Sequence, residues 1–468
     1  MSKLSPPLTE TTLVLETQSF TGLHRLQSHA AGMDIGAHEI WVCVPGEGDT
    51  QIVRLFGTYT AELHAIGDWL GEHGIQTVAM ESTGIYWIPI FEYLELQGLQ
   101  CCLISSRSIK RVPGRKSDIL DCQWIQTLHS YGLLENSFRP EADLVALRTL
   151  LRHRSQLIQH RAPHIQHMQK ALLQMNIQLS QVLSDVMGLT GQAIMRAIGA
   201  GERDPFKLAA LRNYRCQKDE AEIAKALTGT WREEHIFVLQ QALELYDFYT
   251  AQIQACDEQI ERTYALIRPD WPCELPATFP QKRNHSHSKN APANISDLRR
   301  HLLRIAGVDL PAVDGISVPI AQTVLSEIGT DMSRWPTVKH FCSWLGLAPK
   351  NDITGGKVIR SRTHKTKNRA GQAFRLAASA VTRADCAFGA FYRRKKSQIG
   401  PAQAIVATAH MIARTVYFML KNQVEYRHVS AQSFDQRYRA QQIRYLHRKA
   451  AKLGFRLTPI ASSPLAVS

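Results

Sequence analysis

The chain has 468 residues, of which 44% are hydrophobic and 21% are charged. This composition is typical of a folded protein with two or three domains, and it excludes wholesale disorder. The sequence has no run of about 18 apolar residues and no apolar signal segment, so we expect neither a membrane span nor secretion. Nine cysteines without a Cys-x-x-Cys pair favour neither a disulfide framework nor a cysteine zinc site. We therefore expect a cytoplasmic protein.

Positive charge is concentrated in the C-terminal third. The chain carries 55 Lys and Arg against 41 Asp and Glu, a net charge of +14. Residues 350–396 contribute thirteen Lys and Arg against two Asp, and residues 421–456 contribute nine against two acids. Such density favours a nucleic-acid partner, because each neutralised phosphate releases counterions. The alternative is a solvated basic face that only keeps the protein soluble.

The first 140 residues alternate between strand and helix patterns. After an N-terminal extension (1–30), the alternation in 31–44, the turn at 45–49 and the extended run at 51–59 predict a meander. Helices are expected at 60–73, 86–97 and 117–131, and short apolar strands at 77–80 and 100–104. This order predicts an α/β domain over 31–140 with a mixed sheet of ribonuclease-H type.

A helical or coiled-coil region is expected at 141–271. Pro163 is predicted to break or kink the helical pattern that runs from 142 to 175. Apolar residues then recur every seven positions: Leu239, Tyr246, Ile253, Ile260 and Ile267. This spacing fits a coiled-coil seam between subunits, with Thr250 and Asp257 as polar interruptions, and equally a helical hairpin within one chain.

The remainder of the chain predicts a linker, a mainly helical domain and a tail. The linker, at 272–296, is rich in Pro, Asn, His and Ser. The C-terminal domain covers 297–425, and a basic tail covers 426–468.

Four acids stand where a sheet of ribonuclease-H type would bring them together. Asp34 lies in the first strand, Glu81 follows the strand 77–80, and Asp118 and Asp121 are spaced to share one helical face. Oxygen ligands suit Mg²⁺, and two ions about 4 Å apart would hold the attacking and leaving oxygens of a phosphodiester. Taken singly, each acid also has a structural explanation, for example as an N-cap or a first-turn acid.

Two motifs in the C-terminal domain are candidates for phosphate binding. Residues 304–329 predict two short helices around the turn Gly315-Ile316-Ser317, which is similar to a helix-hairpin-helix or is a plain helical hairpin. Further on, Thr354-Gly355-Gly356 places a hydroxyl before two glycines with Lys357 and Arg360 nearby. Glycines let a phosphate approach and cations stabilise transition-state charge, whereas the alternative is a flexible turn.

Together these residues resemble the transposases of the insertion-sequence one-ten family, which includes the Piv-type DNA invertases. The resemblance rests on Asp-Ile-Gly at Asp34, Glu-Ser-Thr-Gly at Glu81, Lys-Ser-Asp-x-x-Asp at Asp118 and Asp121, and Leu-Gly-Leu-Ala-Pro followed by Gly-Gly-Lys, which ends at Lys357. It extends from about residue 31 to about residue 425.

The resemblance implies a recombinase whose N-terminal domain is like the Holliday-junction nuclease RuvC. Asp34, Glu81, Asp118 and Asp121 would form a DEDD quartet that holds Mg²⁺. The C-terminal domain would supply a serine nucleophile that becomes covalently linked to DNA, and the two halves would meet across protomers. A structured noncoding RNA from the ends of the element would pair with donor and target DNA. We expect a dimer or tetramer that works in the bacterial nucleoid.

This chain departs from the family pattern at the serine position, where it has Thr354. The threonine hydroxyl is comparable but its methyl group crowds in-line attack, which leaves a working nucleophile, a weakened enzyme or a decayed element as possibilities. Ser361 is the nearest other hydroxyl. We expect Thr354 to attack, with nucleic acid bound by the basic residues that follow it: Lys357, Arg360, Arg362, Lys365, Lys367 and Arg369.

Two rival functions fit the same sequence. One is a metal-dependent nuclease of Holliday-junction type, which uses water and forms no covalent intermediate. The other is an inactive relic that only binds nucleic acid.

Overall fold

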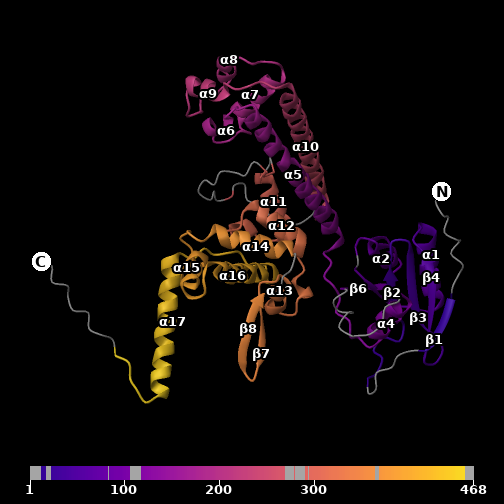
Figure 1. Cartoon of the computed structure of the whole chain (residues 1–468). Helices are drawn as coiled ribbons and strands as arrows, with labels where there is room; N and C mark the ends of the chain where they lie inside the picture. The colour runs from indigo at the N-terminus through magenta and orange to yellow at the C-terminus, as the bar shows by residue number, and fades with distance from the viewer. Residues whose placement is uncertain are drawn as a thin grey trace. The chain divides into compact units, whose positions relative to one another are not determined.

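The computed structural model describes residues 12–16, 23–82, 84–105, 118–268, 279, 290–292, 295–363 and 368–458, with the backbone alone at 118–120, 295–296, 350, 358 and 360–362. The expected linker and the last ten residues of the expected tail therefore lie almost entirely outside the described residues. The chain divides into two compact units, Met1–Arg139 and Pro140–Ser468 (Figure 1).

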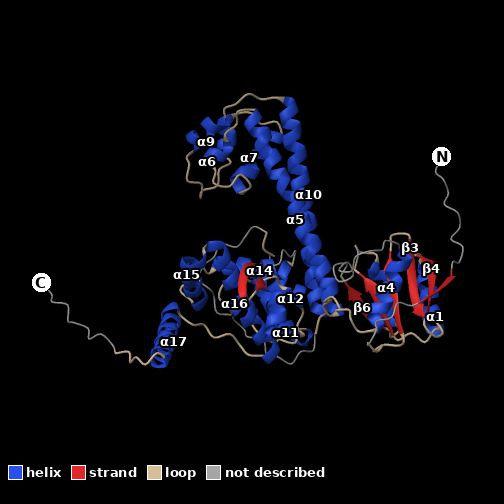
Figure 2. Cartoon of the chain, turned by 60° about the horizontal axis from the view of Figure 1, so that its bottom comes forward, coloured by secondary structure: helices blue, strands red, loops and turns tan. Residues whose placement is uncertain are grey.

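The first unit is built on a six-stranded mixed sheet in the order β1-β4-β3-β2-β5-β6 (Figure 2). Its strands are β1 (Thr12–Glu16), β2 (Ala30–Ile35), β3 (Glu39–Pro45), β4 (Thr50–Gly57), β5 (Thr77–Glu81) and β6 (Gln100–Ile104). The first four pair antiparallel, whereas β2, β5 and β6 pair parallel. This arrangement confirms the predicted α/β sheet of ribonuclease-H, RuvC-like type.

Helices cover both faces of this sheet. α1 (Thr60–Glu72) and α2 (Trp87–Leu96) pack on one face, where Met33 and Met80 are fully buried. α4 (Asp118–Ser130) packs on the opposite face against β2. Each large apolar side chain buried in these layers stabilises the unit by about 1.5–3 kcal/mol.

The strands differ from the sequence prediction in two places. The alternating stretch 31–44 is two strands, β2 and β3, because the chain turns at Gly36, whose N–H bonds back to the carbonyl of Glu39. The edge strand β1 lies in the expected N-terminal extension and pairs with β4. The apolar pattern of β1 is weak in the sequence because none of its five residues is more than half-buried.

The second unit begins with a long antiparallel helical hairpin, α5 (Ala142–Gln174) and α10 (Glu233–Leu266), which Figure 1 shows side by side. The heptad residues Leu239, Ile253 and Ile260 are buried within the single chain. The hairpin interpretation is therefore correct for this seam. Four short helices form a small core at the far end: α6 (Leu179–Val182), α7 (Leu189–Gly199), α8 (Pro205–Ala209) and α9 (Glu220–Leu227).

Arginines of α5 explain the polar interruptions in the heptad. Arg154 forms a two-point ion pair with Asp257, and Arg161 Nη1 donates to Thr250 Oγ1 at 3.1 Å. A buried charged pair fixes register, since any shift leaves a charge without its partner. Of the break or kink predicted at Pro163, the break is wrong, because α5 continues through this exposed proline to Gln174.

The C-terminal part of this unit is mainly helical, as predicted, around a core that includes Phe341, Phe374 and Tyr417. Its helices are α11 (Ile295–Ala306), η1 (Leu310–Ala312), α12 (Val318–Ile328), η2 (Met332–Arg334), α13 (Val338–Trp344), α14 (Arg369–Ala380), α15 (Ala387–Ile399), α16 (Pro401–Asn422) and α17 (Ala431–Lys452). A two-stranded ribbon, β7 (Pro349–Thr354) and β8 (Lys357–Thr363), is not predicted by the sequence pattern. Across the described ranges, no helix has the length and apolar character that a membrane crossing needs.

Candidate functional site

Asp34 and Glu81 lie side by side on neighbouring parallel strands. The register of β2 and β5 pairs Met33 with Met80, and the two acids are the next residues of the two strands. Met33 and Met80 point into the core beneath α1 and α2. Because side chains alternate along a strand, Asp34 and Glu81 share the opposite face, which α4 covers. Both side chains are half-buried.

The first turn of α4 comes toward these two acids. The carbonyl of Ser130, at the end of α4, accepts from the N–H groups of Leu26 and Gln27 at 2.8 and 3.0 Å. Nearer the middle, Gln126 Nε2 donates to the carbonyl of Ala30 at 3.1 Å. α4 therefore runs opposite to β2, and its N-terminal turn, with Asp118 and Asp121, approaches the end of β2 that carries Asp34.

Gly32 allows α4 to lie this close to the sheet. A Cβ at Gly32 would meet the backbone N of Gln126 at 2.3 Å and the carbonyl O of Cys122 at 2.5 Å. Only glycine leaves room for such backbone contact. The sequence shows Gly32 two residues before Asp34, but not that it faces a helix.

Buried polar residues fix the position of α4 along the sheet. Gln51 of β4 donates to Gln126 Oε1 at 2.5 Å and to Thr127 Oγ1 at 3.1 Å, and it accepts from Gln123 Nε2 at 3.0 Å. Buried amides that satisfy one another in this way specify a single arrangement. In the sequence, only a glutamine near the start of β4 hints at this network.

His129, also on α4, is buried against β5. Thr77 Oγ1 and His129 Nε2 are 2.9 Å apart, and burial lowers the pKa of His129 to about 4. The imidazole is therefore neutral at ordinary pH and acts as a packed, hydrogen-bonding residue.

The donor set at this edge consists of carboxylate oxygens, the ligands that Mg²⁺ and similar hard cations prefer. The nearby thiols are unsuited to a metal, since burial and the neighbouring Cys122 raise the pKa of Cys43 well above its usual range. Asp34, Glu81 and Asp121 have described side chains, whereas Asp118 is described by its backbone only. Among the side chains that the structure describes, no group of three or more His, Cys, Asp or Glu is arranged to hold a metal ion.

Thr354 lies at the tip of the β7–β8 ribbon. It pairs with Lys357 across a two-residue turn in which Gly355 and Gly356 have φ values of 56° and 74°. Positive φ at both central residues is the geometry of tight hairpin turns that match strand twist, so glycines are favoured here. The Gly-Gly segment is thus a defined turn, and Thr354 and Lys357 are both exposed.

The other expected nucleic-acid-binding residues are distributed along and beyond this ribbon. Arg360 pairs in register with Asp352, and Arg362 with Lys350. Arg369 begins α14 and is half-buried. Lys365 and Lys367 lie outside the described residues.

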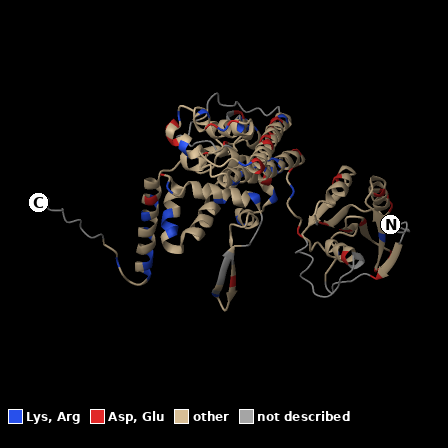
Figure 3. Cartoon of the chain, turned by 45° about the horizontal axis from the view of Figure 1, so that its top comes forward, with Lys and Arg blue, Asp and Glu red and all other residues tan. Residues whose placement is uncertain are grey.

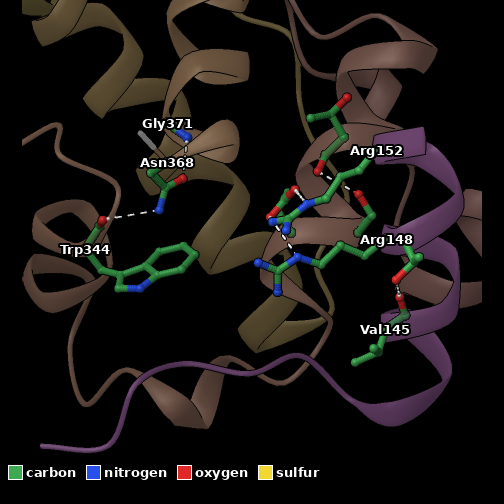
Figure 4. A network of polar contacts seen from close by, with 10 residues as sticks. Val145, Arg148, Arg152, Trp344, Asn368 and Gly371 are labelled. Atoms are coloured by element: carbon green, nitrogen blue, oxygen red, sulfur yellow. Dashed lines mark hydrogen bonds and ion pairs between the residues drawn. The ribbon is translucent and has the colours of Figure 1, made fainter. Parts of the chain in front are cut away.

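The base of the ribbon is pinned to the N-terminus of α14 (Figure 4). Asn368 caps α14 by accepting from Gly371 N at 2.9 Å, and its Nδ2 donates to the carbonyl of Trp344 at 3.3 Å. Arg375 donates to the carbonyl of Gly346 at 2.8 Å. The chain just before β7 and the chain just after β8 are therefore held together.

A buried carboxylate joins the α5–α10 hairpin to the mainly helical C-terminal domain. Glu327 of α12 accepts hydrogen bonds from Arg152 of α5 at 3.1 and 2.8 Å, and it forms an ion pair with Arg148 of α5 at 3.1 Å (Figure 4). Desolvation lowers the pKa of Arg148, an effect that Glu327 opposes. Two guanidinium groups around one buried carboxylate make this contact strongly dependent on all three residues.

The Gly315-Ile316-Ser317 turn is preceded by the short helix η1 rather than by an α-helix. Ser317 caps α12 by accepting from Ile320 N at 3.4 Å. Gly315 has a φ of 87°, and a Cβ there would lie 2.5 Å from the carbonyl of Ala377 in α14. The turn therefore packs inside the domain, which explains the glycine and the serine without a phosphate.

Basic residues also gather on α15 and α17, as Figure 3 shows. Arg394 lies over the ring of Tyr438, 3.6 Å from its centroid, and so ties α15 to the start of α17. No residue of α17 is buried. Arg437, Arg444 and Arg448 recur along it at helical spacing, which suits contact with a phosphate backbone.

Comparison with protein families covers both units. A family model described as a transposase, of the DEDD type of the IS110 family, matches residues 31–177. A second, described as the transposase of the IS116/IS110/IS902 family, matches residues 309–393. A search of curated proteins found no match. The first match includes all four acids and the second includes Thr354. The chain belongs to the IS110 family of transposases.

Proposed function

We propose that this transposase cuts and rejoins DNA through a covalent protein–DNA intermediate, with Mg²⁺ held by Asp34, Glu81, Asp118 and Asp121. The observation that supports the metal site best is the register that sets Asp34 beside Glu81 on the face covered by α4. DEDD transposase domains in general depend on a divalent metal. Mg²⁺ bound to these oxygens would offset negative charge on the phosphate and favour the ionised hydroxyl.

Thr354 is the proposed nucleophile. Its Oγ1 forms a bond to the phosphorus, the bond from phosphorus to one sugar oxygen breaks, and the departing oxygen takes up a proton as the threonine loses one. A phosphodiester replaces a phosphodiester, so the step can be reversed onto another strand. Exposure of Thr354 supports this role, because a phosphate in duplex DNA can reach it. Lys357, directly across the turn, is placed to offset charge on that phosphate.

The proposed partners are donor and target DNA and a structured noncoding RNA from the flanks of the element. DNA follows from the family, and the RNA is supported by the density of cations in residues 350–396 and 421–456. Phosphate neutralisation would supply affinity, whereas base pairing would supply the choice of sequence. We also propose a dimer or tetramer, whose contacts lie outside the heptad seam because α5 already covers that seam.

The experiment combines the full-length protein, RNA transcribed from the flanks of its reading frame, Mg²⁺ and end-labelled DNA from the element's end. We expect a covalent adduct with the wild-type protein, with Thr354→Ser and with Ser361→Ala. Thr354→Ala and Asp34→Asn should each reduce adduct formation by about a thousandfold or more.

Other outcomes would assign the activity differently. An adduct that persists in Thr354→Ala and disappears in Ser361→Ala would transfer the role to Ser361. Free 5′-phosphate ends without an adduct would identify a metal-dependent nuclease. Binding without any cut DNA, unchanged by loss of the four acids, would identify a relic.

A further inference from the structure

We propose that the β7–β8 ribbon is a wedge that enters duplex DNA next to the scissile phosphate, where Ile353 and Ile359 unstack a base step. This inference rests on the proposed function, since it concerns the same DNA and the same ribbon. It adds a mechanical role, strand distortion, to a hairpin that otherwise only carries the nucleophile.

The ribbon exposes two large aliphatic side chains. Ile353 is 60% exposed and Ile359 is 71% exposed. β7 and β8 pair with each other, and neither packs extensively against another described element of the domain. Figure 1 shows the ribbon projecting from the helices around α13 and α14. Within the described part of the chain, packing against apolar neighbours therefore does not explain these two isoleucines.

The positive charges around the two isoleucines indicate that the partner is a polyanion. Between Pro349 and Thr363 the sequence has four cations, Lys350, Lys357, Arg360 and Arg362, against Asp352 alone. Cations bind phosphates, but aliphatic side chains gain nothing from phosphates. The apolar surface that duplex DNA offers is its base stack, which proteins enter by inserting residues such as isoleucine between base steps.

The shape of the ribbon suits entry into a groove. A two-stranded ribbon fits the major groove of DNA, and the Gly355-Gly356 turn leaves the apex without side chains. The register shifts after Asp352, which pairs with Arg360, to Ile353, which pairs with Val358, so that Ile359 is the extra residue of a bulge. Bulges reorient a side chain out of the regular ladder.

The ribbon is also anchored well enough to distort its target. Asn368 and Arg375 hold its two ends to α14 through the carbonyls of Trp344 and Gly346. Ile353 directly precedes Thr354 along the chain. Unstacking by Ile353 would therefore occur at the base step beside the phosphate that Thr354 attacks, and would free that phosphate from regular duplex geometry.

Strand stability is the simpler explanation of the two isoleucines, because β-branched residues favour strands. Threonine separates the two explanations, since it is β-branched but polar. We compare Ile353→Thr/Ile359→Thr with Ile353→Val/Ile359→Val, which keeps both the branching and the apolar surface.

The first measurement does not require DNA cleavage. Duplexes from the element's end, with 2-aminopurine at successive positions, are bound by the full-length protein and flank RNA in EDTA. Fluorescence at one or two adjacent positions should rise about threefold with the wild-type and valine proteins, and should not rise with the threonine protein at equal occupancy. No rise at any position with the wild-type protein, or an equal rise with the threonine protein, would overturn the proposal.

The second measurement uses Mg²⁺ and the adduct assay. On matched duplex, the threonine protein should form adduct about tenfold more slowly or worse, whereas two mismatched pairs beside the scissile phosphate should restore its rate. An equal loss on matched and mismatched DNA would reject the wedge. If no protein forms an adduct on any DNA, the proposed function fails, while the fluorescence result still decides whether the ribbon unstacks bases.

Discussion

The two regions to which we assign the reaction are built in opposite ways. In the first unit, Asp34 and Glu81 stand on neighbouring strands of a sheet. They lie beneath α4, which carries Asp118 and Asp121 and is held by Gly32 and by the buried Gln51 network. Thr354 stands at the exposed tip of the β7–β8 ribbon, whose base is held by the hydrogen bond from Asn368 to the carbonyl of Trp344. A metal site needs several ligands at fixed separations, so it belongs in a packed sheet. A nucleophile needs access to a bulky duplex, so it belongs on a projection.

This contrast predicts different responses to substitution. Changes in the first unit should act through packing and stability, whereas changes in the ribbon should act on the rate with little effect on the fold.

Among substitutions that act through packing, Gly32→Ala should cost the most stability. Its Cβ would collide with the backbone of α4 at Gln126 and Cys122. Because neither atom belongs to a flexible side chain, α4 must move away from β2, which we expect to cost about 3 kcal/mol of the free energy of unfolding. Displacement of Asp121 by about 1 Å should slow adduct formation about a hundredfold. Urea unfolding and the adduct assay measure the two effects.

Gly71→Ala is the matched control. Gly71 lies in α1, and a Cβ there would meet nothing within 4 Å. Alanine should raise stability by up to about 1 kcal/mol, because it is the better helix former. Equal behaviour of the two variants would refute the role assigned to Gly32.

The first unit should lose stability in mild acid because of His129. Its pKa is about 4 in the folded protein, against an ordinary value of 6.5. Between these values the unfolded chain binds a proton that the folded chain does not, so stability falls as pH falls from about 6.5 to about 4. Between about pH 7 and about pH 5 we expect a loss of roughly 2 kcal/mol, because about pH 5 lies roughly 1.5 units below the pKa of the unfolded chain and each unit is worth about 1.4 kcal/mol.

Hydrogen exchange of the α4 amides at about pH 7 and about pH 5 measures this loss. His129→Gln should flatten the dependence, even if it lowers stability at both values. His38→Gln, at an exposed site, should leave it unchanged. A dependence that survives His129→Gln would assign the acid sensitivity to another group.

Substitutions at the ribbon turn should affect the rate more than the fold. Gly355 has a φ of 56° with open space around it, so only backbone strain limits the choice of residue. Valine should cost about 1–2 kcal/mol locally and slow adduct formation about tenfold, whereas asparagine, which tolerates positive φ, should be nearly neutral. A global loss of stability in Gly355→Val, seen in thermal unfolding, would contradict the independence of the ribbon.

The smallest effect is expected on α17, where no side chain is buried. Arg444→Gln and Arg448→Gln should each lower the slope of log binding constant against log salt by about 1, if each arginine contacts one phosphate. The control is Arg262→Gln, which replaces an exposed arginine on α10. Equal slopes for all three variants would remove α17 from the nucleic-acid surface.

Several features could be predicted from the sequence because they depend on local pattern. The alternation of strands and helices in residues 31–131 predicted the type of sheet. With Asp34 in the first strand and Glu81 after the strand 77–80, that type of sheet was expected to bring the two acids together. The family motifs also pointed to Thr354. The β7–β8 ribbon escaped prediction because its residues are mostly polar, and none of its described side chains is buried to produce an alternating pattern.

The tertiary structure decided the features that depend on distant parts of the chain. The heptad of α10 describes an apolar stripe but not its partner, and only packing showed that Arg154 and Arg161 of α5 meet Asp257 and Thr250. Likewise, the sequence shows Gly32 only as a glycine within a strand, whereas the structure shows that the backbone of α4 packs directly against it. Motif and charge are local properties, so the sequence alone was enough to select the candidate site residues. Which of them lie on a rigid sheet and which on a projecting ribbon was decided by contacts between residues far apart in the chain.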